Sequence, residues 1–295
     1  MSLWHLGTLA PNYGSILSLE SLDECAADAE NLGYDSLWVT DHVAVPGSLA
    51  ATYGRIAEAL VTLGYLAART TRITLGVSAL VVPQRQLLLT LKQVMTAQFL
   101  CGGRLAVALA AGWTEQEFAN LGARMTERRT LLEGWEALVA AVAVDAPGRI
   151  DVDLPGLQIV DAAIDPGFVD GNVPPTWIAG HGPAPMRRAA RSGIWHPVGR
   201  AVPVVAELAE TFKAECPDGH IVLRVSVQLT DHVDTDALDQ GGRCRIQGPV
   251  SFVLAQLGRF QAVGVDGFVV DLLTGDGSLS DRMAHFAQEV RPYIS

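Results

Sequence analysis

The chain has 295 residues and 49% of them are hydrophobic, which is enough to bury the core of one large domain or two ordinary ones. It carries 21 Lys and Arg against 32 Asp and Glu, a formal net charge of −11, with no local basic cluster to offset it. This balance argues against a nucleic-acid partner, because binding to a phosphate backbone needs concentrated positive charge. The longest apolar runs, such as residues 138–144, are far shorter than the roughly 18 to 20 residues of a membrane span, so no membrane association is expected.

The cysteines and the N-terminal region bear on the cellular compartment. The four cysteines are widely spaced and form no Cys-x-x-Cys pair, which is typical of reduced thiols. The acidic N-terminal region has no signal-peptide pattern. No pair of histidines or carboxylates has metal-ligand spacing such as His-x-x-x-His. We therefore expect a cytoplasmic protein without disulfides and without a metal site.

The first part of the chain predicts alternating strands and helices. Residues 3–9 form a short apolar strand, and Ser21 and Glu24 have the spacing of a capping box that opens the first helix. Gly33 ends that helix, and residues 35–40 (DSLWVT) form the second strand. A second helix over residues 56–67 carries its apolar residues at helical spacing.

Residues 71–118 predict a strand, a helix and a second strand. Residues 73–82 are nearly all apolar, as a strand covered on both faces must be, and residues 87–95 repeat apolar side chains at helical spacing. Residues 104–109 then restart the strand pattern. Parallel strands joined through a helix form a right-handed crossover, so both strands end at the same edge of the sheet. The loops that follow these two strands therefore share one rim.

The second half of the chain completes the fold prediction. Residues 115–142 are helical in pattern, and residues 145–173 are rich in Asp, Pro and Gly, which indicates an excursion between strands 4 and 5. Four further strands are predicted at residues 176–179, 193–198, 221–229 and 267–271. Eight strands that alternate with helices over about 250 residues or more are typical of a TIM (β/α)8 barrel. The sequence thus predicts an α/β barrel that forms a single domain over residues 1–295.

The candidate site residues follow the predicted strands, because a TIM barrel carries its active site at the carboxyl ends of its strands. His42 comes after the second strand, where an imidazole either exchanges a proton near neutral pH or holds the next loop by hydrogen bonds. His181 and His196 follow later strands and are pocket candidates beside Gly or Pro. Arg200 is a candidate for binding an anionic substrate or a cofactor tail.

Two glycine-containing segments are candidate ligand sites. Residues 180–184 (GHGPA) precede a helix and leave backbone N–H groups and the positive helix end free for an anion such as phosphate, unless they form only a tight connection. Gly112 permits a close approach of the backbone to a ligand. The adjacent Trp113 either covers an aromatic ring or anchors the following helix in the core.

Together these segments resemble the luciferase-like monooxygenase superfamily, which includes bacterial luciferase, alkanesulfonate monooxygenase and the coenzyme F420-dependent dehydrogenases and reductases. The resemblance covers almost the whole chain, and the order and spacing of its segments make it specific. The matching segments are DSLWVTDH, TRITLGVSALVVPQRQ, GGRLAVALAAGWTEQEFANLG, ERRTLLEG, PPTWIAGHGPAPMRRAARSG and GVDGFVVD.

The resemblance implies roles for individual residues. His42 corresponds to a histidine that faces the cofactor ring and handles a proton, which makes it the expected catalytic residue. Ser78 and Ala79 fall where members have a non-proline cis peptide that supports the ring, and Gly112 falls beside the cofactor tail. The phosphate-binding turn corresponds to Gly180, His181, Gly182, Pro183 and Ala184. The expected substrate contacts are Trp113, His196 and Arg200.

Two residues depart from the pattern of the superfamily. Trp113 occupies the position where some F420-dependent branches carry a catalytic carboxylate, which argues against a sugar-phosphate dehydrogenase mechanism that uses such an acid. His181 replaces a residue that is usually small, which narrows the expected phosphate pocket.

The resemblance also implies an activity. We expect an F420-dependent oxidoreductase that transfers a hydride between coenzyme F420 and a small organic substrate. The alternatives are an FMN-dependent monooxygenase that uses reduced flavin, O2 and a separate reductase, and a flavin-binding relative without turnover. The resemblance further implies a homodimer. No readable pattern in the loops at residues 43–53, 145–173 and 230–248 identifies the substrate.

Overall fold

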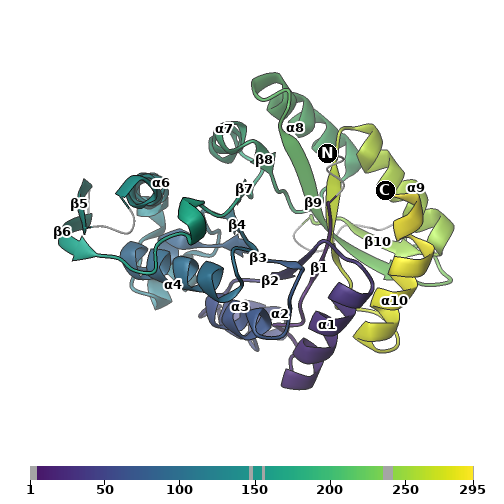
Figure 1. Ribbon diagram of the computed structural model, residues 1–295. Coiled ribbons are helices and arrows are strands. Elements are labelled where there is room, and N and C mark those ends of the chain that lie inside the picture. Colours follow the sequence, from purple (N-terminus) through teal and green to yellow (C-terminus); the bar gives the residue numbers. More distant parts are fainter. Residues whose placement is uncertain (1–4, 146–148, 155–156, 235–241, 295) are drawn as a thin grey trace.

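A computed structural model of the chain describes residues 5–145, 149–154, 157–234 and 242–294. Eight parallel strands pair in the order β11-β1-β2-β3-β4-β7-β8-β9, and β9 also pairs with β11, so the sheet closes into a barrel (Figure 1). These strands are β1 (His5–Leu9), β2 (Ser36–Val39), β3 (Thr74–Leu80), β4 (Leu105–Leu109), β7 (Thr176–Ile178), β8 (Ile194–Trp195), β9 (His220–Leu229) and β11 (Gly267–Asp271). The predicted TIM barrel is confirmed. Residues 3 and 4 of the first predicted strand lie outside the described residues.

Helices surround the barrel and alternate with its strands (Figure 1). The longer ones are α1 (Leu19–Asn31), α3 (Ala59–Ala67), α4 (Leu87–Leu100), α6 (Arg128–Asp145), α7 (Pro183–Ser192), α8 (Val202–Glu215), α9 (Val250–Ala262) and α10 (Leu279–Glu289). Shorter helical segments are η1 (Gly47–Leu49), α2 (Ala50–Tyr53), η2 (Val82–Gln84), α5 (Glu115–Asn120), η3 (Met125–Glu127), η4 (Val169–Gly171) and η5 (Arg291–Tyr293). Within the part of the chain that the structure describes, every helix is too short or too polar to cross a membrane.

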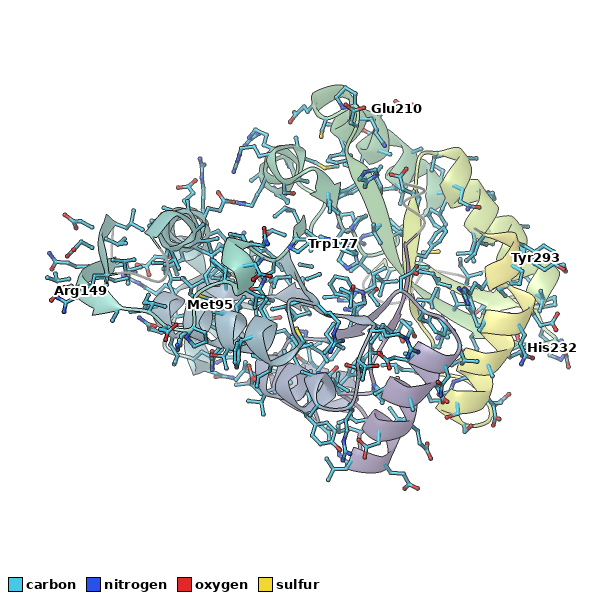
Figure 2. The ribbon with its side chains drawn as sticks, in the orientation of Figure 1. Met95, Arg149, Trp177, Glu210, His232 and Tyr293 are labelled. Atoms are coloured by element: carbon cyan, nitrogen blue, oxygen red, sulfur yellow. The ribbon has the colours of Figure 1, made fainter. Side chains whose placement is uncertain are left out.

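Tryptophan side chains fill the barrel interior, and small residues on the strands make room for them. The rings of Trp38 on β2 and Trp177 on β7 pack with centroids 4.4 Å apart, and Figure 2 shows Trp177 among the side chains inside the barrel. A Cβ atom on Gly76 of β3 would lie 2.3 Å from the Trp38 ring. A side chain at Gly76 is therefore incompatible with this packing, since real contacts are never that short.

The predicted excursion forms a separate hairpin. Strands β5 (Arg149–Leu154) and β6 (Leu157–Ala163) pair antiparallel and lie beyond α6, away from the barrel, at the left of Figure 1. An additional strand, β10 (Arg245–Gly248), pairs parallel with the carboxyl half of β9. The predicted excursion between the fourth and fifth barrel strands, which are β4 and β7, is thus confirmed.

The start of the first helix differs from the sequence prediction. The N-cap of α1 is Ser18, whose side chain accepts a hydrogen bond from the backbone of Ser21, while the Ser21 side chain accepts one from the backbone of Ser18. The capping box therefore begins three residues earlier than predicted, and Glu24 lies within the helix. Serine fills both positions here because its hydroxyl can both donate and accept.

Candidate active site

Two adjacent cavities lie at the carboxyl ends of the barrel strands. The larger has a volume of about 690 Å³ and extends from β4 and β7 to α6 and α7, and the smaller, of about 130 Å³, lies over β2 and β3. The residues that line both cavities are Ala110, Gly112, Trp113, Ala179, Val198 and Arg243. The shared walls join the cavities into one candidate site at the rim that the sequence predicts.

His42 lines the smaller cavity. It follows β2, is 7% exposed, and its Nδ1 atom lies 2.9 Å from Oε2 of Glu117. The Tyr53 ring packs against the imidazole with centroids 4.5 Å apart, and the Trp113 ring meets it edge-on at 6.3 Å. The structure thus holds the imidazole from three sides within the candidate site.

Glu117 on α5 is a site residue that the sequence reasoning missed. Its side chain is buried, with 1% exposed, and its Oε1 atom accepts hydrogen bonds from the backbone N–H groups of Val43 at 2.8 Å and Ala44 at 3.3 Å. Burial raises the pKa of Glu117, but the hydrogen bonds from His42 and Val43 outweigh it and lower the pKa overall. An ionised carboxylate only accepts hydrogen bonds, so His42 carries a proton on Nδ1.

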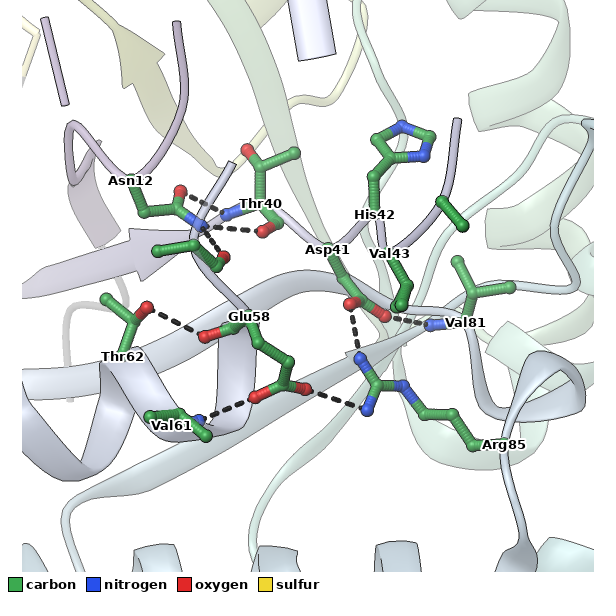
Figure 3. Close-up of polar contacts among 12 residues, drawn as sticks. Asn12, Thr40, Asp41, His42, Val43, Glu58, Val61, Thr62, Val81 and Arg85 are labelled. Carbon is green, nitrogen blue, oxygen red and sulfur yellow. Dashed lines mark hydrogen bonds and ion pairs between the residues drawn. The ribbon is translucent and has the colours of Figure 1, made fainter. Parts of the chain in front are cut away.

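Asp41 faces the opposite direction from its neighbour His42 (Figure 3). Its carboxylate accepts hydrogen bonds from the Val81 backbone at 2.9 Å and from Arg85 at 2.6 Å. Arg85 also contacts Glu58 at 2.8 Å, and Glu58 caps the N-terminus of α3. Asp41 therefore ties the end of β2 to the end of β3.

The predicted cis peptide between Ser78 and Ala79 is present. Pairing between β3 and β4 is interrupted between Val77 and Leu80, so this peptide stands outside the regular ladder. The Ser78 carbonyl accepts a hydrogen bond from Arg224, and both Ser78 and Ala79 line the smaller cavity. The structure places the pair in the wall of the candidate site.

His196 is hydrogen-bonded to the side chain of Ser78. Its Nδ1 atom donates to the Val222 carbonyl at 2.6 Å, and Nε2 lies 2.8 Å from the Ser78 hydroxyl. Because the carbonyl can only accept, Nδ1 carries a proton, and the Ser78 hydroxyl, which can donate as well as accept, bonds to Nε2. The ring is 1% exposed and packs against Trp38 and Trp177. His196 is thus at the floor of the smaller cavity with both ring nitrogens engaged by the protein.

Gly112 is required by the local packing. Its φ angle is +78°, and an added Cβ would lie 2.6 Å from the Phe118 ring and 2.8 Å from Val81. This glycine therefore lets α5, which carries Glu117 and Phe118, pack closely against the loop after β3.

We expect Gly112→Ala to lower the free energy of unfolding by about 2–4 kcal/mol. An alanine there is strained by the left-handed backbone conformation, and its methyl group also overlaps Phe118 and Val81. Gly14 provides a matched control, because its φ angle is also +78° but its Cβ would meet nothing within 4 Å. Gly14→Ala should cost about 1–2 kcal/mol from strain alone. Urea denaturation of both variants tests the difference, and equal losses would contradict the packing argument.

Trp113 is exposed rather than buried in the core. Its relative exposure is 55%, and it lines both cavities. Of the two interpretations that the sequence left open, the core anchor is therefore wrong. The ring lies where it can cover a bound molecule.

The turn before α7 offers fewer N–H donors than the sequence suggests. Gly182 is the N-cap of α7 without a side-chain cap, and both Pro183 and Pro185 lack an N–H group. Gly180 has a φ angle of +119°, and its carbonyl accepts from the indole of Trp195 at 2.8 Å. Within the first turn of α7, Ala184 supplies the N–H group between the two prolines. Gly180 and Ala184 line the larger cavity.

His181 lies half-buried in the wall of the larger cavity. Its Nε2 atom donates to the Val198 carbonyl at 2.8 Å. Burial lowers the pKa of His181 below its usual value; the bond to Val198 opposes this shift and the charge of Arg200 adds to it. The ring is therefore neutral at neutral pH, with its proton on Nε2 and an acceptor at Nδ1.

Arginine side chains concentrate around the larger cavity of this acidic protein. The residues are Arg128, Arg129, Arg188, Arg200 and Arg243. Arg129 pairs with Glu133 at 3.0 Å, and Arg188 pairs with Glu136. Arg128 makes no ion pair with any residue in the described ranges. Sequence reasoning identified Arg200 alone, because the others converge from separate elements.

The described residues contain no group of three or more His, Cys, Asp or Glu side chains arranged to hold a metal ion. The two cavities instead combine apolar walls, a cluster of arginine side chains and the imidazoles of His42 and His181. This combination suits a flat organic ring attached to an anionic tail.

Comparisons with known proteins place this geometry in context. Residues 1–236 match the family model described as luciferase-like monooxygenase. The alkanal monooxygenase alpha chain of Photorhabdus luminescens is 20% identical over 184 residues, which are 62% of this chain and 49% of that protein. The chain therefore spans about half the length of the curated relatives that it matches.

Solved structures share the fold at low sequence identity. An F420-dependent secondary alcohol dehydrogenase in complex with an F420-acetone adduct has a TM-score of 0.81 and 14% identity, covering 99% of both chains. The oxygenating constituent of 3,6-diketocamphane monooxygenase from Pseudomonas putida, in complex with FMN, has a TM-score of 0.75 and 13% identity, covering 100% of this chain and 99% of that one.

Proposed function

Because the chain belongs to the luciferase-like monooxygenase family, we propose that it is an oxidoreductase that transfers a hydride between coenzyme F420 and a small organic substrate. The observation that carries this proposal is the ring of arginines around the larger cavity. F420 has a phosphodiester and a glutamate tail, and hence several negative charges, whereas FMN ends in one phosphate. A cluster of guanidinium groups matches the more highly charged tail.

Each of the two cavities suits a different part of such a cofactor. The smaller one, with the Ser78–Ala79 peptide and His42 in its wall, suits the edge of the ring. The larger one provides apolar walls and then Arg128 and Arg200 for the tail. The Ala184 N–H at the start of α7 adds one donor for an anionic oxygen. The residues therefore fit the group in shape and in charge.

The chain's own residues supply proton handling and exclusion of water. When bound, F420 accepts or donates the hydride. His42 exchanges the accompanying proton with the substrate through Nε2, while its Nδ1–H group continues to donate a hydrogen bond to Glu117. Trp113 covers the cavity mouth and keeps bulk water from the reacting atoms. Both ring nitrogens of His196 contact protein atoms. We therefore propose that His196 holds Ser78 in place and does not contact the substrate.

A monooxygenase that uses reduced FMN is the second candidate, because both the alkanal monooxygenase relative and the FMN-bound structural neighbour are monooxygenases. A direct titration of F420, FMN and FAD against the purified protein distinguishes them. We expect micromolar binding of F420, seen as a change in its fluorescence, and weaker binding of FMN. Tight binding of FMN with no response from F420 would reject the F420 proposal.

A further inference from the structure

We propose that Glu117 is the positioning residue of His42, and that it fixes the imidazole in the tautomer that presents an unprotonated Nε2 to the cavity. This inference rests on the proposed role of His42 in the reaction. It concerns a contact between α5 and the loop after β2, two segments that lie 75 residues apart in the chain.

The hydrogen bonds of Glu117 place a proton on Nδ1 of His42. Oε2 accepts from Nδ1 of His42, and Oε1 accepts from two backbone N–H groups, at Val43 and Ala44. A buried carboxylate that is stabilised by three donors stays ionised and cannot donate in return. The same carboxylate therefore sets both the course of the loop and the protonation of the ring that the loop carries.

Other charged groups near the imidazole do not compete for Nδ1. Arg224 and Arg243 line the same cavity, and Tyr53 packs on the ring, but Arg224 donates to Ser78 and Thr40, and Arg243 donates to the Tyr53 hydroxyl. The carboxylate of Asp41 is held by Arg85. Glu117 is the acidic group in contact with the ring.

Two other histidines provide internal references for the tautomer. His196 donates through Nδ1 to a carbonyl, and His181 donates through Nε2 to another carbonyl. The structure thus predicts that His42 and His196 share one tautomer and that His181 adopts the other. Long-range nitrogen–proton correlation spectra of isotope-labelled histidine distinguish the two forms.

Glu117→Gln is the informative substitution because it keeps the shape and removes the charge. If the amide oxygen accepts from Nδ1, the amide NH2 group faces the N–H groups of Val43 and Ala44, and two sets of donors oppose each other. If the amide flips, the NH2 group faces Nδ1–H. The variant can relieve the conflict by moving the His42 proton to Nε2, which is what we expect.

The test uses the cofactor-free protein, with His42 signals assigned from the His42→Gln spectrum. In the wild type, His42 should show the Nδ1–H form, and in Glu117→Gln most of its population should shift to Nε2–H, while His181 and His196 keep their signals. Glu117→Asp, which keeps the charge, should retain the Nδ1–H form. Glu115→Gln is the matched control on the same helix, since Glu115 is exposed, and it should leave all three signals unchanged.

Two outcomes would overturn the proposal: an Nε2–H tautomer of His42 in the wild type, or an unchanged Nδ1–H signal in Glu117→Gln. Unchanged signals of His181 and His196 establish that the variant is folded. If Glu117→Gln unfolds, Glu117→Asp decides, because loss of the Nδ1–H form in that folded, charged variant would also reject the proposal. Failure of the F420 proposal would appear separately, as absent F420 binding with the tautomers unchanged.

Discussion

Replacing His42 with alanine should lower the proposed F420-dependent turnover by about 10²–10⁴-fold, which is the usual contribution of a positioned general acid or base. The imidazole is held by Glu117 and Tyr53, and its Nε2 is the nitrogen that remains for proton exchange. Cofactor affinity should change little, because the substitution leaves the arginines that we propose to bind the tail untouched. Turnover is measured from the cofactor's visible absorbance with a panel of small alcohols and carbonyl compounds, and affinity from its fluorescence.

His285→Ala is the control for this experiment. His285 lies exposed on α10, away from both cavities, so its loss should leave turnover unchanged. If His42→Ala keeps wild-type turnover while binding F420 normally, the imidazole does not handle the proton. A combined loss of turnover and binding would instead indicate that His42 shapes the cofactor pocket.

The barrel could be predicted from the sequence because its signals are local. Each strand is a short apolar run, and each helix repeats apolar residues at its own period, so the eightfold alternation is visible without tertiary information. The same logic places His42, Ser78 and Gly112 at one rim, since His42 and Gly112 each follow a strand and Ser78 lies near the carboxyl end of β3. Position relative to a strand end therefore carried most of the information about the candidate site.

The contacts that complete the site depend on packing between distant segments. Glu117 contacts His42, which lies 75 residues earlier in the chain. Arg128 at the start of α6 and Arg243 just before β10 line the same cavity. No local pattern in the sequence distinguishes these side chains from the other charged residues of the chain. The turn that leads into α7 shows the opposite case, because Pro183 and Pro185, which lack an N–H group, are visible in the sequence.

Replacing Arg128 with glutamine should weaken F420 binding by about tenfold to a hundredfold, the range expected for losing a charge-assisted hydrogen bond. Arg128 lines the larger cavity and has no ion-pair partner among the residues that the structure describes, so its charge is available to an anionic tail. The neighbouring Arg124 is exposed, pairs with Glu127 and does not line the cavity, which makes Arg124→Gln the matched control.

The salt dependence of binding separates a direct contact from a general effect of charge. Raising ionic strength screens the attraction between the tail and the arginines, so wild-type affinity should fall steadily with added salt. Arg128→Gln should show a shallower fall, because one contributing charge is gone, whereas Arg124→Gln should follow the wild type. If both variants weaken binding equally, the cofactor responds to the net charge of the protein, and the arginine-lined cavity does not hold the tail.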